Sequence, residues 1–221
     1  MHMKSWQFVV MAVIGCGAGL FLLLIFLGYI LNIPGKRGVI LPSPETSASI
    51  APTTPSDVRV FERGPQGAPV TVIAYMDFTC AHCKTMNGYV NRLVTKYPST
   101  LRVLWKDLFS ATNNTAERIH IAARCAGEQD KFWEFRDGAY TIQPNATEQR
   151  LRVLASSIGL NVPQFSTCIT RDDHGAFFDA TRAEARALGI EVTPTLIMND
   201  NRVSGLVEFT QLQQWIEQLQ K

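Results

Sequence analysis

Two cysteines, Cys80 and Cys83, stand in a Cys-x-x-Cys spacing where an apolar strand pattern gives way to a helical one. The β-branched and aromatic run Val70–Tyr75 predicts a buried strand, and the apolar spacing over Lys84–Tyr97 predicts a helix. Cys80 therefore falls at or just before the first helical turn. Unpaired backbone N–H groups and the positive end of the helix dipole favour a thiolate there. His82 adds a second cationic or hydrogen-bonding group, and the spacing suits dithiol–disulfide chemistry.

The N-terminal part of the chain is strongly apolar, and no charged residue occurs over Ser5–Gly35. This interval exceeds the ~20 residues that a membrane-spanning helix needs, and Phe21–Tyr29 is densely apolar. We therefore predict a retained transmembrane anchor over residues 1–33 rather than a cleaved signal peptide. Lipidation of Cys16 is the alternative, because Val13–Cys16 resembles a bacterial lipoprotein cleavage box, although strongly apolar residues follow it.

Residues 34–56 are rich in Pro, Ser and Thr and show no apolar periodicity, which predicts a flexible linker. The remainder, 57–221, has the composition of one folded domain. Basic and acidic residues are nearly balanced over the whole chain, at 21 and 19. The sequence therefore lacks the basic surface that nucleic-acid binding requires, and we predict no nucleic-acid partner.

The domain alternates strands and helices before a long helical section. Leu101–Lys106 predicts a strand after the strand–helix unit, and a β-α-β pattern implies parallel pairing. A short strand over Asp57–Phe61 precedes this unit. Helices are predicted over Asn113–Glu128, Lys131–Tyr140, Thr147–Ile158 and Gln164–Leu188, followed by a hairpin over Thr195–Gly205 and an amphipathic helix over Thr210–Gln220.

Four stretches in this order resemble the DsbA-like thiol–disulfide oxidoreductases. They are Val70–Cys83, Trp105–Asp107, Phe132–Phe135 and Leu188–Thr195, and the resemblance runs from about residue 57 to the end. It implies an α/β thioredoxin fold with an inserted helical domain at about 112–187. It also implies a redox-active Cys80–Cys83 disulfide and no further cofactor.

The resemblance assigns roles to further residues. It implies a cis peptide bond before Pro194, with Thr193 and Pro194 shaping a site for an extended substrate peptide. Several relatives carry a second, structural disulfide in the helical insert, which implies a Cys125–Cys168 bridge. Two separate buried thiols are the alternative for this pair.

The sequence departs from the resemblance at the proton-transfer position. Many thioredoxin-fold enzymes place a buried acid six residues before the first cysteine, where this chain has Ala74. Asp77 and Lys106 are candidates for proton transfer, and a structural ion pair is the alternative role for them. His120 and His174 lack partners at ligand spacing, so we predict no metal site.

The predicted activity is the introduction of disulfide bonds into secreted or surface proteins through Cys80 and Cys83. Substrates are expected to be unfolded or reduced proteins, with a membrane quinone-linked oxidase of the DsbB or vitamin-K-epoxide-reductase type as redox partner. A reductase or isomerase is the alternative, and a non-catalytic chaperone or binding module a more distant one. Because a Cys125–Cys168 disulfide implies an oxidising compartment, the predicted location is the inner membrane, single-pass, with a periplasmic catalytic domain.

Overall fold

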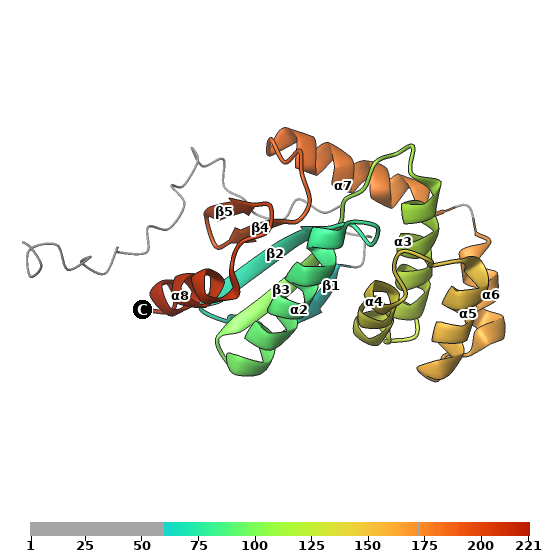
Figure 1. The fold of residues 1–221 in the computed structure, drawn as a ribbon, viewed down its shortest axis with the longest axis horizontal. Helices are drawn as coiled ribbons and strands as arrows, with labels where there is room; N and C mark the ends of the chain where they lie inside the picture. The colour runs from blue at the N-terminus through green and yellow to red at the C-terminus, as the bar shows by residue number, and fades with distance from the viewer. Residues whose placement is uncertain (1–59, 172) are drawn as a thin grey trace, which may run out of the picture. The chain divides into compact units, whose positions relative to one another are not determined.

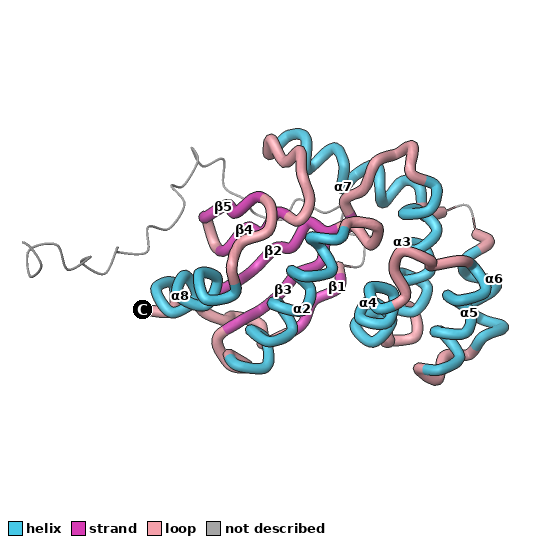
Figure 2. The backbone as a smooth tube through the Cα atoms, in the orientation of Figure 1, coloured by secondary structure: helices cyan, strands magenta, loops and turns pink. Residues whose placement is uncertain are grey.

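The computed structural model describes residues 60–171 and 173–221, and these contain one mixed sheet (Figure 2). Its strands are β1 (Phe61–Arg63), β2 (Val70–Met76), β3 (Leu101–Asp107), β4 (Thr195–Met198) and β5 (Asn201–Ser204). The strand order is β1-β3-β2-β4-β5. β2 and β3 are parallel, as the β-α-β pattern predicts, and the other neighbouring pairs are antiparallel.

The parallel pair brings two acidic residues to one edge of the sheet. Met76, the last residue of β2, lies opposite Asp107, the last residue of β3. Asp77 follows β2 directly, so both carboxylates lie at the edge where parallel strands end. The cysteine-bearing helix α2 (Ala81–Lys96) begins at this same edge.

The helical insert lies between β3 and β4. Its first four helices contact one another, and Figure 1 shows them gathered beside the strand-bearing part. They are α3 (Asn114–Gly127), α4 (Phe132–Thr141), α5 (Glu148–Ser157) and α6 (Val162–Ile169). α7 (Gly175–Ala187) contacts β3, and α8 (Phe209–Leu219) closes the domain.

The single helix predicted over Gln164–Leu188 is wrong, because the structure has two helices there, α6 and α7. The Asn161 side chain caps α6, which contains Pro163 in its first turn. The segment that separates the helices contains Asp173, and α7 opens with Gly175. Asp and Gly have low helix propensity, so this segment is a natural break.

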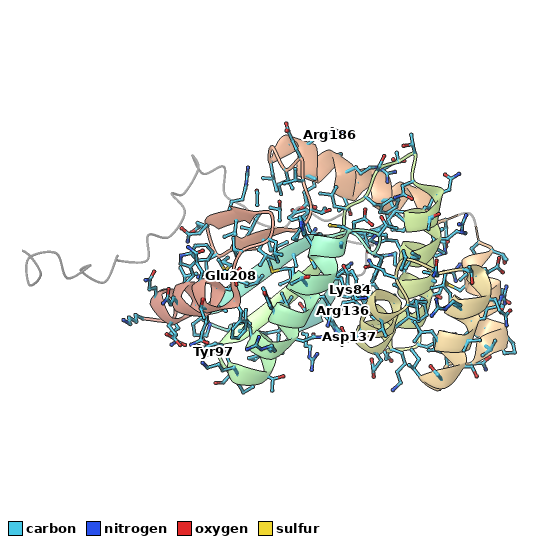
Figure 3. All side chains as sticks on the ribbon, in the orientation of Figure 1. Lys84, Tyr97, Arg136, Asp137, Arg186 and Glu208 are labelled. Atoms are coloured by element: carbon cyan, nitrogen blue, oxygen red, sulfur yellow. A yellow bond between two sulfur atoms is a disulfide. The ribbon has the colours of Figure 1, made fainter. Side chains whose placement is uncertain are left out.

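A half-buried polar network holds α4 against α2. Asp137 accepts hydrogen bonds from the amides of Asn87 and Asn91 at 2.9 and 3.0 Å. It also pairs with the adjacent Arg136 at 2.8 Å, although Arg136 is only 1% exposed. Figure 3 labels Arg136 and Asp137, which belong to α4. The insert is therefore tied to the helix that carries both cysteines.

The predicted location, a single-pass inner-membrane protein with a periplasmic catalytic domain, needs correction. Among the residues that the structure describes, no helix combines the length and apolar composition that crossing a bilayer requires. α2, the longest of these helices, has 16 residues and spans about 24 Å, against a hydrocarbon core of ~30 Å. The predicted anchor (1–33), including Cys16, and the predicted linker (34–56) lie outside the described residues.

Candidate active site

Cys80 is the N-cap residue of α2. Its backbone is extended (φ −83°, ψ 124°), and its sulfur accepts the Cys83 N–H with an N–Sγ distance of 3.3 Å. Cys80 is half-buried, so its sulfur borders solvent at the positive end of the helix dipole. His82, in the first turn of α2, is exposed beside it. The strand-to-helix junction thus presents one sulfur to an incoming thiol.

Cys83 is fully buried one turn further along the helix. Burial raises the pKa of its thiol, and the negative charge of a neighbouring Cys80 thiolate raises it further. The main-chain N–H of Asp77 donates to Cys83 Sγ at 3.5 Å. The two sulfurs therefore differ in access, although both are free thiols in this structure.

The loop before β4 lies against Cys80. The Thr193–Pro194 peptide bond is cis, and the Thr193 carbonyl accepts from Cys80 Sγ at 3.5 Å. Val192, just before it, is 52% exposed. A cavity of about 430 Å³ adjoins this loop and is bordered by Asp77, Phe109, Arg182, Arg186 and Thr193. The structure thus brings the predicted substrate-binding residue Thr193, which precedes Pro194 in the chain, to the half-buried sulfur.

Lys106 belongs to a buried ion pair. Its ammonium lies 2.8 Å from the Glu184 carboxylate of α7, with side-chain exposures of 0% and 9%. The Tyr75 hydroxyl donates to the same carboxylate at 2.8 Å. Burial and the charge of Glu184 raise the pKa of Tyr75, so the phenol remains a neutral donor. Lys106 therefore has the Glu184 carboxylate of α7 as an ion-pair partner.

Asp77, the other proton-transfer candidate, faces a residue that the sequence analysis discounted. His120 of α3 is fully buried, and its Nδ1 lies 2.6 Å from Asp107 Oδ1. Its Nε2 lies 3.8 Å from Asp77 Oδ1. Trp105 and Arg124 donate to Asp107 at 2.7 and 3.1 Å. We call Asp77, Asp107, His120 and Arg124 the buried charge cluster.

Electrostatics within this cluster favour its charged forms. Burial alone lowers the pKa of His120, but hydrogen bonds and attraction from Asp107 and Asp77 raise it above the ordinary value of 6.5. Burial likewise raises the pKa of both carboxyls, and His120 outweighs it, bringing them below their ordinary value of 3.8. The sequence carried a signal for this cluster. His120 falls on the apolar face of its predicted helix, four residues after Ala116. An imidazole on such a face is expected to be buried and to need a polar partner.

The buried charge cluster predicts a pH optimum for stability. The lowered carboxyl pKa values contribute stability above pH 3.8 that is lost as the pH falls through them. The raised imidazole pKa contributes stability below pH 6.5 that is lost as the pH rises through it. We therefore expect urea unfolding free energies to fall on both sides of pH 3.8–6.5. In His120→Gln the decrease in unfolding free energy above pH 6.5 should be smaller than in wild type, whereas His174→Gln should show the wild-type decrease. Equal decreases in wild type and both variants would contradict the role of His120.

The disulfide implied by the resemblance is present between Cys125 of α3 and Cys168 of α6, with a Cα–Cα distance of 5.7 Å. His174 Nε2 lies 3.9 Å from the Cys125 sulfur and 3.1 Å from the Cys168 carbonyl. These three side chains bring metal-ligating atoms within 4.8 Å of one another. The two sulfurs are bonded to each other, however, so neither is a thiolate that could bind a metal ion.

Comparison with known proteins agrees with this arrangement. A protein-family model described as thioredoxin matches residues 57–218. The thiol-disulfide exchange protein alpha-DsbA2 from Wolbachia pipientis is similar in structure, with a TM-score of 0.66 and 20% identity, covering 74% of this chain and 88% of that one. A thioredoxin-like oxidoreductase from Silicibacter pomeroyi DSS-3 gives a TM-score of 0.65 and 24% identity, covering 72% and 91%. At these identities the likeness shows the fold.

The chain is also similar in sequence to part of a much longer protein. Over 145 residues it is 32% identical to the Na(+)/H(+) antiporter NhaA 3 of Salinispora tropica, which covers 65% of this chain and 22% of the relative. The chain thus spans about a fifth of the length of the curated relatives it matches.

Proposed function

The chain belongs to the thioredoxin family, and on that premise we propose that it is a thiol–disulfide oxidoreductase that introduces disulfide bonds into reduced proteins. The observation that carries the proposal is the contrast between the two sulfurs. Cys80 is half-buried at the N-terminus of α2 beside Thr193, whereas Cys83 is fully buried. The likeness to a solved thiol–disulfide exchange protein supports the same class of reaction.

The chemistry follows from which sulfur a substrate reaches. In the oxidised protein a substrate thiolate attacks Cys80; a substrate–Cys80 bond forms, the Cys80–Cys83 bond breaks, and Cys83 leaves with the electron pair. A second thiolate of the substrate then attacks the substrate sulfur that is bonded to Cys80. A disulfide forms within the substrate, the mixed disulfide breaks, and Cys80 leaves as a thiolate. The substrate loses two electrons and gains a disulfide, while the cysteine pair is left reduced.

Neighbouring residues have supporting roles in this scheme. His82 provides a cationic or hydrogen-bonding group beside Cys80. Thr193 and Pro194 border the position of the substrate chain, since the Thr193 carbonyl contacts the exchanging sulfur. Asp77 is our proton-transfer candidate, because its main-chain N–H donates to Cys83 Sγ and its carboxyl group belongs to the same residue.

The direction of exchange depends on how well Cys80 leaves as a thiolate. The Cys83 N–H and the dipole of α2 both point at its sulfur, and stabilising that anion makes the disulfide a stronger oxidant. A reductase or isomerase of the same fold is the runner-up. A binding module with purely structural cysteines is the more distant alternative.

An oxidant that acts repeatedly has to be recharged. Each cycle leaves two electrons on the cysteine pair, so a partner must accept them. A quinone-linked oxidase of the DsbB or vitamin-K-epoxide-reductase type fits this role, because quinones take up two electrons. This oxidase has to react with Cys80, since Cys83 is buried.

A redox titration of the Cys80–Cys83 pair tests the proposal. In glutathione buffers, with the thiols alkylated and counted by mass spectrometry, we expect a reduction potential near about −120 mV. A value near about −270 mV would reverse the direction to that of a reductase. If glutathione never equilibrated with Cys80, the oxidoreductase assignment itself would fail.

A further inference from the structure

The cavity beside the reactive sulfur is bordered by two arginines from one helix. Arg182 and Arg186 of α7 line this cavity of about 430 Å³ together with Thr193, whose carbonyl lies 3.5 Å from Cys80 Sγ. Figure 3 labels Arg186 on α7. The two arginines are four residues apart in the helix, so they lie on the same helical face. A substrate chain that reaches Cys80 therefore comes close to two cationic side chains.

Both guanidinium groups are available to a bound chain. Arg186 is exposed, and among the residues that the structure describes its guanidinium has neither a hydrogen-bond nor an ion-pair partner. Arg182 lies over the ring of Phe109, another lining residue, at 5.4 Å from the ring centroid. It pairs with Asp179 at 2.7 Å, but the Asp179 side chain is 77% exposed. An exposed ion pair contributes little free energy, so a carboxylate of a bound chain can replace Asp179 at little cost.

Apolar side chains line the same cavity. Phe109, Ala185 and Ile190 border it, and they are 6%, 1% and 4% exposed. A glutamate side chain fits both kinds of lining, because its methylene groups can pack on apolar atoms while its carboxylate reaches a guanidinium. Arginine and carboxylate also match in geometry, since two parallel N–H donors of the guanidinium can bind both carboxylate oxygens.

Two acidic residues also border the cavity, and they differ in availability. The Asp77 side chain is 13% exposed, and its carboxylate accepts the N–H and the hydroxyl of Thr79 at 2.7 and 2.8 Å. Glu191 is exposed two residues before Thr193, and its carboxylate has no partner among the described residues. Glu191 is therefore the lining acid that most directly opposes the two arginines, and removing its charge should strengthen their effect.

We propose that Arg182 and Arg186 are specificity-determining residues, which bind an acidic side chain of the substrate protein near its reacting cysteine. The inference rests on the proposed function, because the substrate in question is the chain that exchanges with Cys80. It goes beyond that function by naming the charge of the substrate segment that is preferred and the side chains that recognise it.

The experiment compares dithiol peptides that differ at a single residue near the reacting cysteine, which is glutamate, glutamine or lysine. Each flanking position is varied in turn, and the rate of peptide oxidation by the oxidised full chain is measured at neutral pH and low salt. At the best position we expect the glutamate peptide to react about three- to tenfold faster than the lysine peptide. An exposed ion pair accounts for up to about fivefold, and lysine replaces attraction with repulsion. Salt at about 1 M should bring this ratio towards one.

Charge variants locate the preference in the cavity. Arg186→Glu should lower the ratio of glutamate-peptide to lysine-peptide rates at least about threefold, and Arg182→Gln/Arg186→Gln should bring it close to one. Glu191→Gln should raise the ratio. Lys96→Glu is the matched control and should keep the wild-type ratio, because it makes the same charge change at the far end of α2, about 24 Å along the helix from Cys80. The ratio compares two peptides on one protein, so an effect of a variant on the Cys80 thiolate cancels.

Two outcomes overturn the inference. A wild-type ratio of one or below at every flanking position would show that the cavity selects no acidic side chain. Equal changes of the ratio in Arg186→Glu and Lys96→Glu would show that net charge, and not the cavity, governs the preference. Failure of the proposed function is distinguishable, because no peptide of any charge would then form a mixed disulfide at Cys80. A reductase would show the same preference in the reduction of disulfide-bonded peptides, since the same cavity borders the sulfur.

Discussion

Cys80→Ser is expected to abolish thiol–disulfide exchange, with a loss on the order of a thousandfold or more, as when an enzyme's nucleophile is removed. The reason is access. Cys80 is half-buried at the end of α2, whereas Cys83 is fully buried and burial raises the pKa of its thiol. A substrate that finds serine at position 80 meets no sulfur it can reach. The measurement is the oxidation of a fluorescent dithiol peptide by stoichiometric oxidised protein.

Cys83→Ser is the matched control for this prediction. It keeps the exchanging sulfur and removes the resolving one, so it should capture disulfide-bearing substrates as stable mixed disulfides at Cys80. Non-reducing electrophoresis and mass spectrometry would identify the attachment site. Residual exchange above about a tenth of wild type in Cys80→Ser, or attachment at another cysteine, would show that a different sulfur reacts with substrate.

Cys125→Ser/Cys168→Ser is expected to lower the free energy of unfolding by about 4 kcal/mol, the value that chain entropy gives for a loop of this size. The bridge spans a sequence separation of 43 and joins α3 to α6, so it restricts much of the insert in the unfolded chain. Urea unfolding of the oxidised variant against oxidised wild type measures the difference. Exchange at Cys80 should survive at temperatures where the variant is folded.

The Cys125→Ala/Cys168→Ala variant separates the loss of the bridge from the burial of new hydroxyls. Serine places polar groups at positions that are 0% and 3% exposed, and alanine does not. Both variants should therefore lose stability, with serine losing slightly more. A difference from wild type below about 1 kcal/mol in the alanine variant would mean that packing alone holds α3 and α6 together.

Local patterns were sufficient for the parts of the site that lie close together in sequence. The strand–helix junction at Cys80 follows from apolar periodicity over some 30 residues, and the parallel β2–β3 pairing follows from the β-α-β order. The same reasoning failed at Gln164–Leu188, where apolar spacing continues across a break between α6 and α7. Periodicity reports which residues face a core, and it is insensitive to a short interruption between two helices that face the same core.

The sequence by itself predicted the Cys80–Cys83 pair as the exchanging sulfurs, because the spacing of two cysteines at the start of a helix is a local pattern. Only the tertiary structure decided which charges act on them. Lys106 is paired with Glu184, 78 residues away, and His120 of α3 lies between Asp77 and Asp107 at the ends of two strands. Electrostatic partners are chosen by distance and burial in space, and a linear pattern carries neither quantity across an insert of five helices.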